Sequence, residues 1–233
     1  MSNSSAQLAH PAIATAKGPA LAALLNDPRV WRGQAALEPS ASVTTGHPEL
    51  DAALPQRGWP EAALSEILFA ADGLGELRLV LPTLAMLTQA GLTVLLIGPP
   101  YQPYGPALQR AGLALKQVHV VQTQGADALW ASEQCLRSGA CAAVLSWPLS
   151  ADDRALRRLQ LAAETGRTLG FVLRPLSAAR NASPAALRLT LEASLPAQLP
   201  SALSKTRSEL KVRVLKCRGG HAQPGPITLR LAH

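Results

Sequence analysis

The stretch FAADGLGELRLVLPTLA, residues 69–85, has the position and the glycines of a phosphate-binding loop. A strand-like apolar run precedes it and a helical pattern follows it. A loop of the form G-x-x-x-x-G-K-[ST] uses its lysine for the β- and γ-phosphates and its hydroxyl for Mg²⁺. With the last glycine of that motif placed at Gly75, Ala70 takes the first glycine, Glu76 the lysine and Leu77 the hydroxyl position. Because a glutamate repels phosphate, we predict a turn that lacks the chemistry of a phosphate loop.

Other parts of a nucleotide hydrolase are also missing from the sequence. The strand-like run CAAVLSW, 141–147, ends in Ser146 and Trp147, where such an enzyme carries an acidic magnesium ligand. Residues 100–102 include no glutamate that could activate water. The histidines are scattered, and no Cys-x-x-Cys pair or Ser–His–acid set can be assembled from the spacing. We predict no enzymatic activity, cofactor or metal, and nucleotide binding without hydrolysis stays open.

Strand-like and helix-like segments alternate between residues 64 and 175. The strand-like runs are continuously apolar, which is typical of strands covered on both faces, and their spacing indicates a parallel sheet. Beyond Pro175 the sequence shows a run with period-two alternation, 184–193, and then two runs, 210–218 and 226–232, that favour a hairpin. The predicted fold class is α/β, with a mostly parallel central sheet flanked by helices and a C-terminal β-hairpin at the sheet edge. The predicted strands are 64–70, 93–99, 118–122, 141–147 and 169–175, and the predicted helices are 76–90, 107–113, 127–139 and 151–167.

Changes in composition predict three parts of the chain: a flexible segment with a short helix (1–43), an α/β core (44–193), and a basic linker with the hairpin (194–233). Trp31, Trp59 and Trp147 are predicted to pack in or near the core, while Trp59 could instead anchor an exchange between subunits. No window is long and apolar enough to span a membrane, and the N-terminus lacks the pattern of a secretory signal. We expect a cytoplasmic protein.

Basic residues are concentrated in the C-terminal third. Residues 1–150 carry eight Lys and Arg against ten Asp and Glu, a balance of −2, whereas residues 151–233 carry fourteen against five, a balance of +9. Such asymmetry indicates DNA or an acidic partner. A solvated helix surface, or protection of an edge strand against aggregation, would also explain these residues. The candidate contact residues are Arg154, Arg157, Arg158, Lys205, Arg207, Lys211, Arg213, Lys216 and Arg218.

Several stretches resemble a known family. Residues 104–147 are similar to a region of RecA, and the segments PRVWRG (28–33), TGHPELDAALPQRGWPEAALSEI (45–67) and VRVLKCRGG (212–220) resemble ImuA, a RecA- and SulA-related protein of bacterial mutagenesis cassettes. The resemblance implies a RecA-like core in a non-catalytic accessory protein of SOS-induced, error-prone translesion DNA synthesis. The implied partners are the Y-family polymerase relative ImuB, RecA and, indirectly, an error-prone C-family polymerase. DNA is a further candidate partner, which would place the protein at the nucleoid.

Two alternatives remain open at this point. A SulA-like inhibitor of the division GTPase is compatible with the related fold, although the longer chain and the basic hairpin favour ImuA. A DNA-dependent ATPase with an unusual loop is the other, and the acidic residue Glu76 argues against it.

Overall fold

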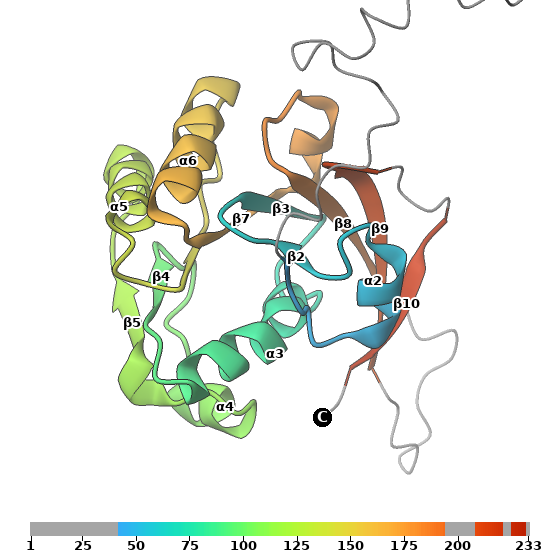
Figure 1. Ribbon diagram of the computed structural model, residues 1–233, viewed down its shortest axis with the longest axis horizontal. Coiled ribbons are helices and arrows are strands. Elements are labelled where there is room, and N and C mark those ends of the chain that lie inside the picture. Colours follow the sequence, from blue (N-terminus) through green and yellow to red (C-terminus); the bar gives the residue numbers. More distant parts are fainter. Residues whose placement is uncertain (1–41, 194–207, 221–224, 232–233) are drawn as a thin grey trace, which may run out of the picture. The chain divides into compact units, whose positions relative to one another are not determined.

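The computed structural model describes residues 42–193, 208–220 and 225–231 (Figure 1). Contacts divide the chain into two units, Met1–Glu38 and Pro39–His233, and all described residues belong to the second. The predictions for Trp31, Lys205 and Arg207 therefore lie outside the described residues.

A mixed sheet of eight strands forms the centre of the described residues. Its order is β10-β9-β8-β3-β7-β6-β4-β5, in which β9 is antiparallel to both neighbours and the other pairs are parallel. The predicted α/β fold with a mostly parallel sheet is confirmed, and the hairpin β9–β10 lies at the sheet edge as expected. The strands are β3 (Leu64–Phe69), β4 (Val94–Ile97), β5 (Val118–Val121), β6 (Ala143–Ser146), β7 (Leu169–Pro175), β8 (Leu187–Ala193), β9 (Ser208–Cys217) and β10 (Ile227–Leu231).

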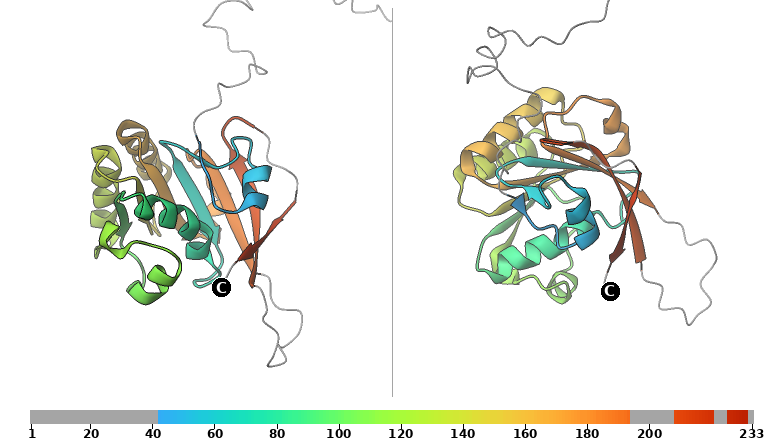
Figure 2. Two further views of the ribbon diagram at one scale, coloured as in Figure 1. Left: turned by 60° about the horizontal axis from the view of Figure 1, so that its bottom comes forward. Right: turned by 45° about the vertical axis from the view of Figure 1, so that its right-hand side comes forward.

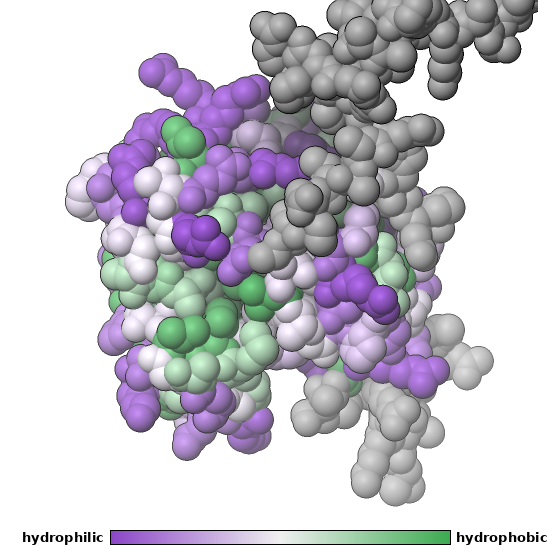
Figure 3. All heavy atoms as spheres, viewed as in Figure 1, coloured by the Kyte–Doolittle hydropathy of each residue, from purple (hydrophilic) through white to green (hydrophobic). Residues whose placement is uncertain are grey.

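Helices cover both faces of this sheet (Figures 1 and 2). On one face lie α2 (Pro48–Ala53), α3 (Glu76–Gln89) and α4 (Gly105–Arg110), and on the other lie α5 (Gly125–Ser138) and α6 (Asp153–Gly166). Short 3-10 turns, η1 (Leu115–Gln117) and η2 (Leu176–Arg180), and a two-stranded ribbon of β1 (Ser42–Val43) and β2 (Trp59–Pro60) complete the described elements. In the space-filling view, apolar residues gather over the C-terminal half of α3 (Figure 3).

Two of the predicted core tryptophans are buried in the structure. Trp59 is fully buried, and its indole Nε1–H donates to Thr83 Oγ1 of α3 at 2.9 Å. Its ring meets Phe171 of β7 edge to face, with the ring centroids 5.1 Å apart. Trp147 is also buried. Core packing therefore explains Trp59, because a subunit exchange would need the ring to be accessible.

Strand β8 differs from its predicted half-exposed pattern. Period-two alternation predicts that Arg188 and Thr190 face solvent, yet Arg188 is only 7% exposed and Thr190 only 6%. Arg188 is buried because its guanidinium reaches a buried carboxylate on the neighbouring strand, an interaction that alternation along one strand does not reveal.

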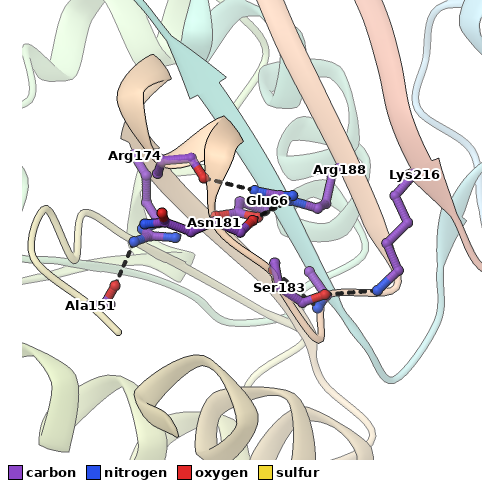
Figure 4. Close-up of polar contacts among 9 residues, drawn as sticks. Glu66, Ala151, Arg174, Asn181, Ser183, Arg188 and Lys216 are labelled. Atoms are coloured by element: carbon purple, nitrogen blue, oxygen red, sulfur yellow. Dashed lines mark hydrogen bonds and ion pairs between the residues drawn. The ribbon is translucent and has the colours of Figure 1, made fainter. Parts of the chain in front are cut away.

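That carboxylate is Glu66 of β3, which is fully buried and bound by two arginines (Figure 4). Arg174 of β7 donates from Nη1 to Glu66 Oε1 at 2.6 Å, and Arg188 of β8 donates from Nε to Oε2 at 2.5 Å. The remaining Nη groups donate to backbone oxygens: Arg174 to Ala151, and Arg188 to Ala178 and Asn181. One carboxylate thus joins three adjacent strands and holds η2 against them.

We predict that Glu66→Gln lowers the free energy of unfolding by about 3–5 kcal/mol, because it leaves two buried guanidinium groups without their counter-charge. Urea denaturation monitored by circular dichroism measures the change. The matched control is Glu192→Gln, which removes the exposed pair with Arg213 (3.1 Å) and costs at most about 1 kcal/mol. Equal effects of the two variants would contradict the central role of Glu66.

Candidate functional site

The turn at the phosphate-loop position is occupied by its own glutamate. The Glu76 carboxylate accepts hydrogen bonds from the backbone N–H of Gly73 and of Gly75, both at 3.0 Å. Both glycines have left-handed backbone conformations, with φ of 81° and 107°. Backbone N–H groups at such a turn before a helix form an anion site. Here the anion is a side chain of the same chain, which satisfies the donors that a phosphate would need.

The C-terminal hairpin packs against the same turn. A Cβ atom added at Gly75 would lie 3.6 Å from Leu210 Cδ1 of β9 and 3.7 Å from Leu231 Cδ1 of β10. Part of the turn is therefore covered by strands that are more than a hundred residues away in the sequence.

Hydroxyl side chains lie at the two positions where a nucleotide hydrolase would carry its catalytic glutamate and its acidic magnesium ligand. Tyr101 donates its hydroxyl to Asp72 Oδ2 at 3.1 Å, and this hydrogen bond to a carboxylate raises the tyrosine pKa. Ser146, at the end of β6, is buried and donates to the backbone oxygen of Phe171 at 3.5 Å. Both hydroxyls have partners within the chain.

A groove of about 770 Å³ lies beside α3 and α4. Its floor is mostly apolar, and the side chains of Arg78 and Arg110 provide its positive charge. His47 also lines the groove, and its Nε2 lies 3.1 Å from the Leu79 carbonyl oxygen. The lining residues are His47, Arg78, Leu81, Pro82, Ala107, Arg110, Ala111 and Leu231.

Exposed apolar side chains occur on the segments next to the groove. Met86 in α3 is 42% exposed, Leu92 beyond α3 is 46% exposed, and Leu115 in η1 is 39% exposed. The C-terminal part of α3 is fixed to the segment after α4, because Gln89 Nε2 donates to the Gly112 oxygen at 2.7 Å and the Ala114 N–H donates to Thr88 Oγ1 at 3.1 Å. We call the groove together with Met86, Leu92 and Leu115 the α3–α4 surface. Arginines and accessible apolar side chains in one region are typical of protein-binding surfaces.

The predicted arginines of α6 do not form an open patch of three cations. Arg157 pairs with Asp153 at 2.8 Å, and Arg158 pairs with Glu133 of α5. Arg154 is exposed and, among the described residues, has no ion pair. Two of the three arginines are thus paired within the helical layer. The pair within α6 has i,i+4 spacing, whereas the pair with Glu133, which also binds Arg137, joins two helices.

The predicted basic residues of β9 are kept on one side of the sheet. Arg213 pairs with Glu192, Arg218 with Glu164 at 3.2 Å, and Lys216 donates to the Ser183 oxygen at 2.8 Å. Arg218 contacts the C-terminal part of α6, whereas Arg154 lies in the first turn of that helix. The basic residues of the hairpin and those of α6 therefore form two separate groups.

Within the described residues, no cluster of three or more histidines, cysteines, aspartates or glutamates could hold a metal ion. In the same part of the chain, no helix combines the length and apolar character needed to cross a membrane. All three cysteines are free, and burial raises their thiol pKa values, that of Cys141 to about 11.

Fold and site together define an α/β protein whose phosphate-loop turn is filled by its own carboxylate. The family model described as cell division inhibitor SulA matches residues 62–170. SulA from Pectobacterium atrosepticum is 34% identical over 121 residues, which is 51% of this chain and 72% of that protein. SulA from Yersinia pestis is 32% identical over 117 residues, 49% of this chain and 68% of its own length. The crystal structure of SulA from Pseudomonas aeruginosa shares 32% identity over 49% of this chain and 98% of that chain, with a TM-score of 0.42. The chain belongs to the SulA family.

The sequence-based identification as ImuA is wrong, because the family model and the curated relatives that match are SulA. The role in translesion synthesis and the partners ImuB, RecA and a C-family polymerase were implied by that identification, so these predictions are also wrong. The alternative, a SulA-like division inhibitor, is the reading that the comparisons support. The segments that resemble ImuA carry structural rather than catalytic residues, so they could not separate the two families.

We predict that Glu76→Ala lowers the free energy of unfolding by about 0.5–2 kcal/mol, because it leaves the Gly73 and Gly75 N–H groups without their acceptor. Glu76→Gln retains one acceptor oxygen, so its loss should be smaller. Thermal and urea denaturation of the two variants measure the difference, with the exposed Glu209→Ala as control. Wild-type stability in Glu76→Ala would show that the carboxylate does not hold the turn.

Proposed function

We propose that the protein is a non-catalytic inhibitor of cell division that acts by binding the division GTPase FtsZ. Membership of the SulA family carries this proposal, since the matching relatives are described as cell division inhibitors. An SOS-induced setting in the cytoplasm fits this role.

The absence of catalysis is supported by the state of the phosphate-loop turn. Glu76 uses the N–H donors of the turn, Leu77 replaces the metal-binding hydroxyl, and Ser146 replaces the acidic ligand. With these replacements, the fold can present surfaces but lacks the groups that would position a nucleotide and its Mg²⁺. A RecA-like core is part of this proposal, supported by the central place of β3 and the turn that follows it. The division into 1–43, 44–193 and 194–233 also remains a prediction.

The α3–α4 surface is the proposed docking site for the GTPase. It combines an apolar-floored groove, two arginines and the exposed side chains of Met86, Leu92 and Leu115. Burial of apolar surface is the dominant favourable term in most protein association, and arginine is enriched at the energetic centres of interfaces. The described surface lies within residues matched by the family model, apart from His47 and Leu231.

The test is GTP-dependent polymerisation of purified FtsZ, followed by light scattering and sedimentation. We expect the full chain at equimolar concentration to abolish assembly and to lower GTP turnover in parallel, because subunits are withdrawn from the polymer. Normal assembly with an excess of this protein, in a preparation that a curated SulA relative inhibits, would refute the proposal. The purified protein itself, without FtsZ, should show no binding of ATP with Mg²⁺ at micromolar concentrations.

We predict that the double variant Met86→Glu, Leu115→Glu loses inhibition by at least about tenfold, because it places two charges in an interface that must be desolvated. The dose–response curve of the polymerisation assay measures the loss. The matched control is Leu161→Glu, since Leu161 is 59% exposed on α6, away from the α3–α4 surface. An equal loss of inhibition in the control, or full inhibition by the double variant, would contradict the assignment of the docking site to the α3–α4 surface.

A further inference from the structure

The strands β8, β9 and β10 lie beyond residue 170, where the match to the family model ends. Their core side is apolar, with Leu189, Leu191, Leu210, Val212 and Leu229 all buried. On the opposite side of the sheet, α5 and α6 cover only the middle strands (Figures 1 and 2). Helix α2 packs against β10, but it lies on the core side. The outward side of β9 and β10 therefore has no helix over it among the described elements. We call it the basic face.

Cations follow one another along the basic face. The strand register places Lys211 beside Glu192 and Thr228, Arg213 beside Thr190, and Lys216 beside Arg188. Arg230 of β10 lies opposite Glu209 on the same side. With Glu164, the partner of Arg218, included, the face carries an excess of two positive charges over Glu192, Glu209 and Glu164. Its cations are Lys211, Arg213, Lys216, Arg218 and Arg230.

A β-bulge keeps these cations together. Strict alternation after Val214 would turn Lys216 and Arg218 to the apolar core. The register shifts there, so that Val214 pairs with Leu189 and Lys216 with Arg188, and Leu215 is the additional residue. This bulge lies inside β9. It returns Lys216 to the side that already holds Lys211 and Arg213.

Protection of an edge strand does not explain this arrangement. Charged side chains that prevent edge-to-edge aggregation are needed on the outermost strand of a sheet. Strand β9 is paired on both sides, by β8 and by β10, and β10 is the edge. The row of cations therefore lies on an interior strand, where aggregation through an open edge does not arise.

We propose that the basic face binds the phosphate backbone of a nucleic acid without reading its bases. Strands β8, β9 and β10 carry no aromatic residue on which a base could stack. Lys211 and Arg230 have no ion pair within the described residues, so their charges are available to an incoming anion. A folded acidic protein is a poorer fit, because a protein interface needs an apolar centre and this face offers only Leu215, which is 40% exposed.

The test measures fluorescence anisotropy of fluorescein-labelled DNA, single-stranded and duplex, of about 30 nucleotides, titrated with the full chain. Titrations between roughly 50 and 200 mM salt give the salt dependence, which reports the number of phosphate contacts. The face variant is Lys211→Ala, Arg230→Ala. The matched control is Lys116→Ala, Arg154→Ala, which removes two exposed cations from other surfaces.

We expect the face variant to bind at least about tenfold more weakly and its salt slope to fall by roughly 1.4–1.8, while the control binds like the wild type. Equal weakening in both variants would overturn the proposal, since net charge alone would then account for binding. Failure of the wild type to bind DNA at the lowest salt would overturn it too, and binding of poly-glutamate in its place would identify an acidic protein as the partner. Inhibition of FtsZ assembly by the face variant should be unchanged, so this inference and the proposed function succeed or fail separately.

Discussion

The ion cluster centred on Glu66 holds together parts of the fold that the sequence separates widely. Its carboxylate lies on β3, the strand that leads to the phosphate-loop turn, and its two guanidinium partners lie on β7 and β8. Because a buried charge is tolerated only with its counter-charges in place, the three strands must be aligned at this point for any of them to be buried. The family match covers β3 and ends inside β7, whereas β8 lies beyond it. The cluster therefore joins the SulA-like part of the chain to its C-terminal strands.

A second constraint acts at the end of the same strand. In a nucleotide-binding fold, the turn after this strand leaves its N–H donors open for phosphate. In this protein, Glu76 accepts from those donors, and the hairpin residues Leu210 and Leu231 pack nearby. The arrangement retains the geometry of the turn and satisfies its donors internally. This state of the turn agrees with the proposed inhibitor, which would act by binding.

The two proposed surfaces lie on different parts of the fold and have different chemistry. The α3–α4 surface is apolar with two arginines, which suits a desolvated contact with a folded protein. The basic face is charged and nearly free of large apolar side chains, which suits the hydrated and salt-dependent contact of a phosphate backbone. The side chains of the basic face point away from the apolar core, on the side of the sheet opposite to α3 and α4. Substitutions on that face can therefore leave the α3–α4 surface intact.

The sequence by itself determined the order and type of the elements, because periodicity, glycine turns and apolar runs are local signals. It also determined that Glu76 occupies the lysine position of the phosphate-loop motif. Only the tertiary structure decided that Arg188 is buried, that Arg158 pairs with Glu133, and that α3, α4 and β10 line one groove. The segments likened to ImuA carried structural rather than functional residues, so they could not distinguish that family from SulA. Each feature that the sequence left undecided depends on residues brought together from distant strands and helices, and pattern along a chain does not encode those distances.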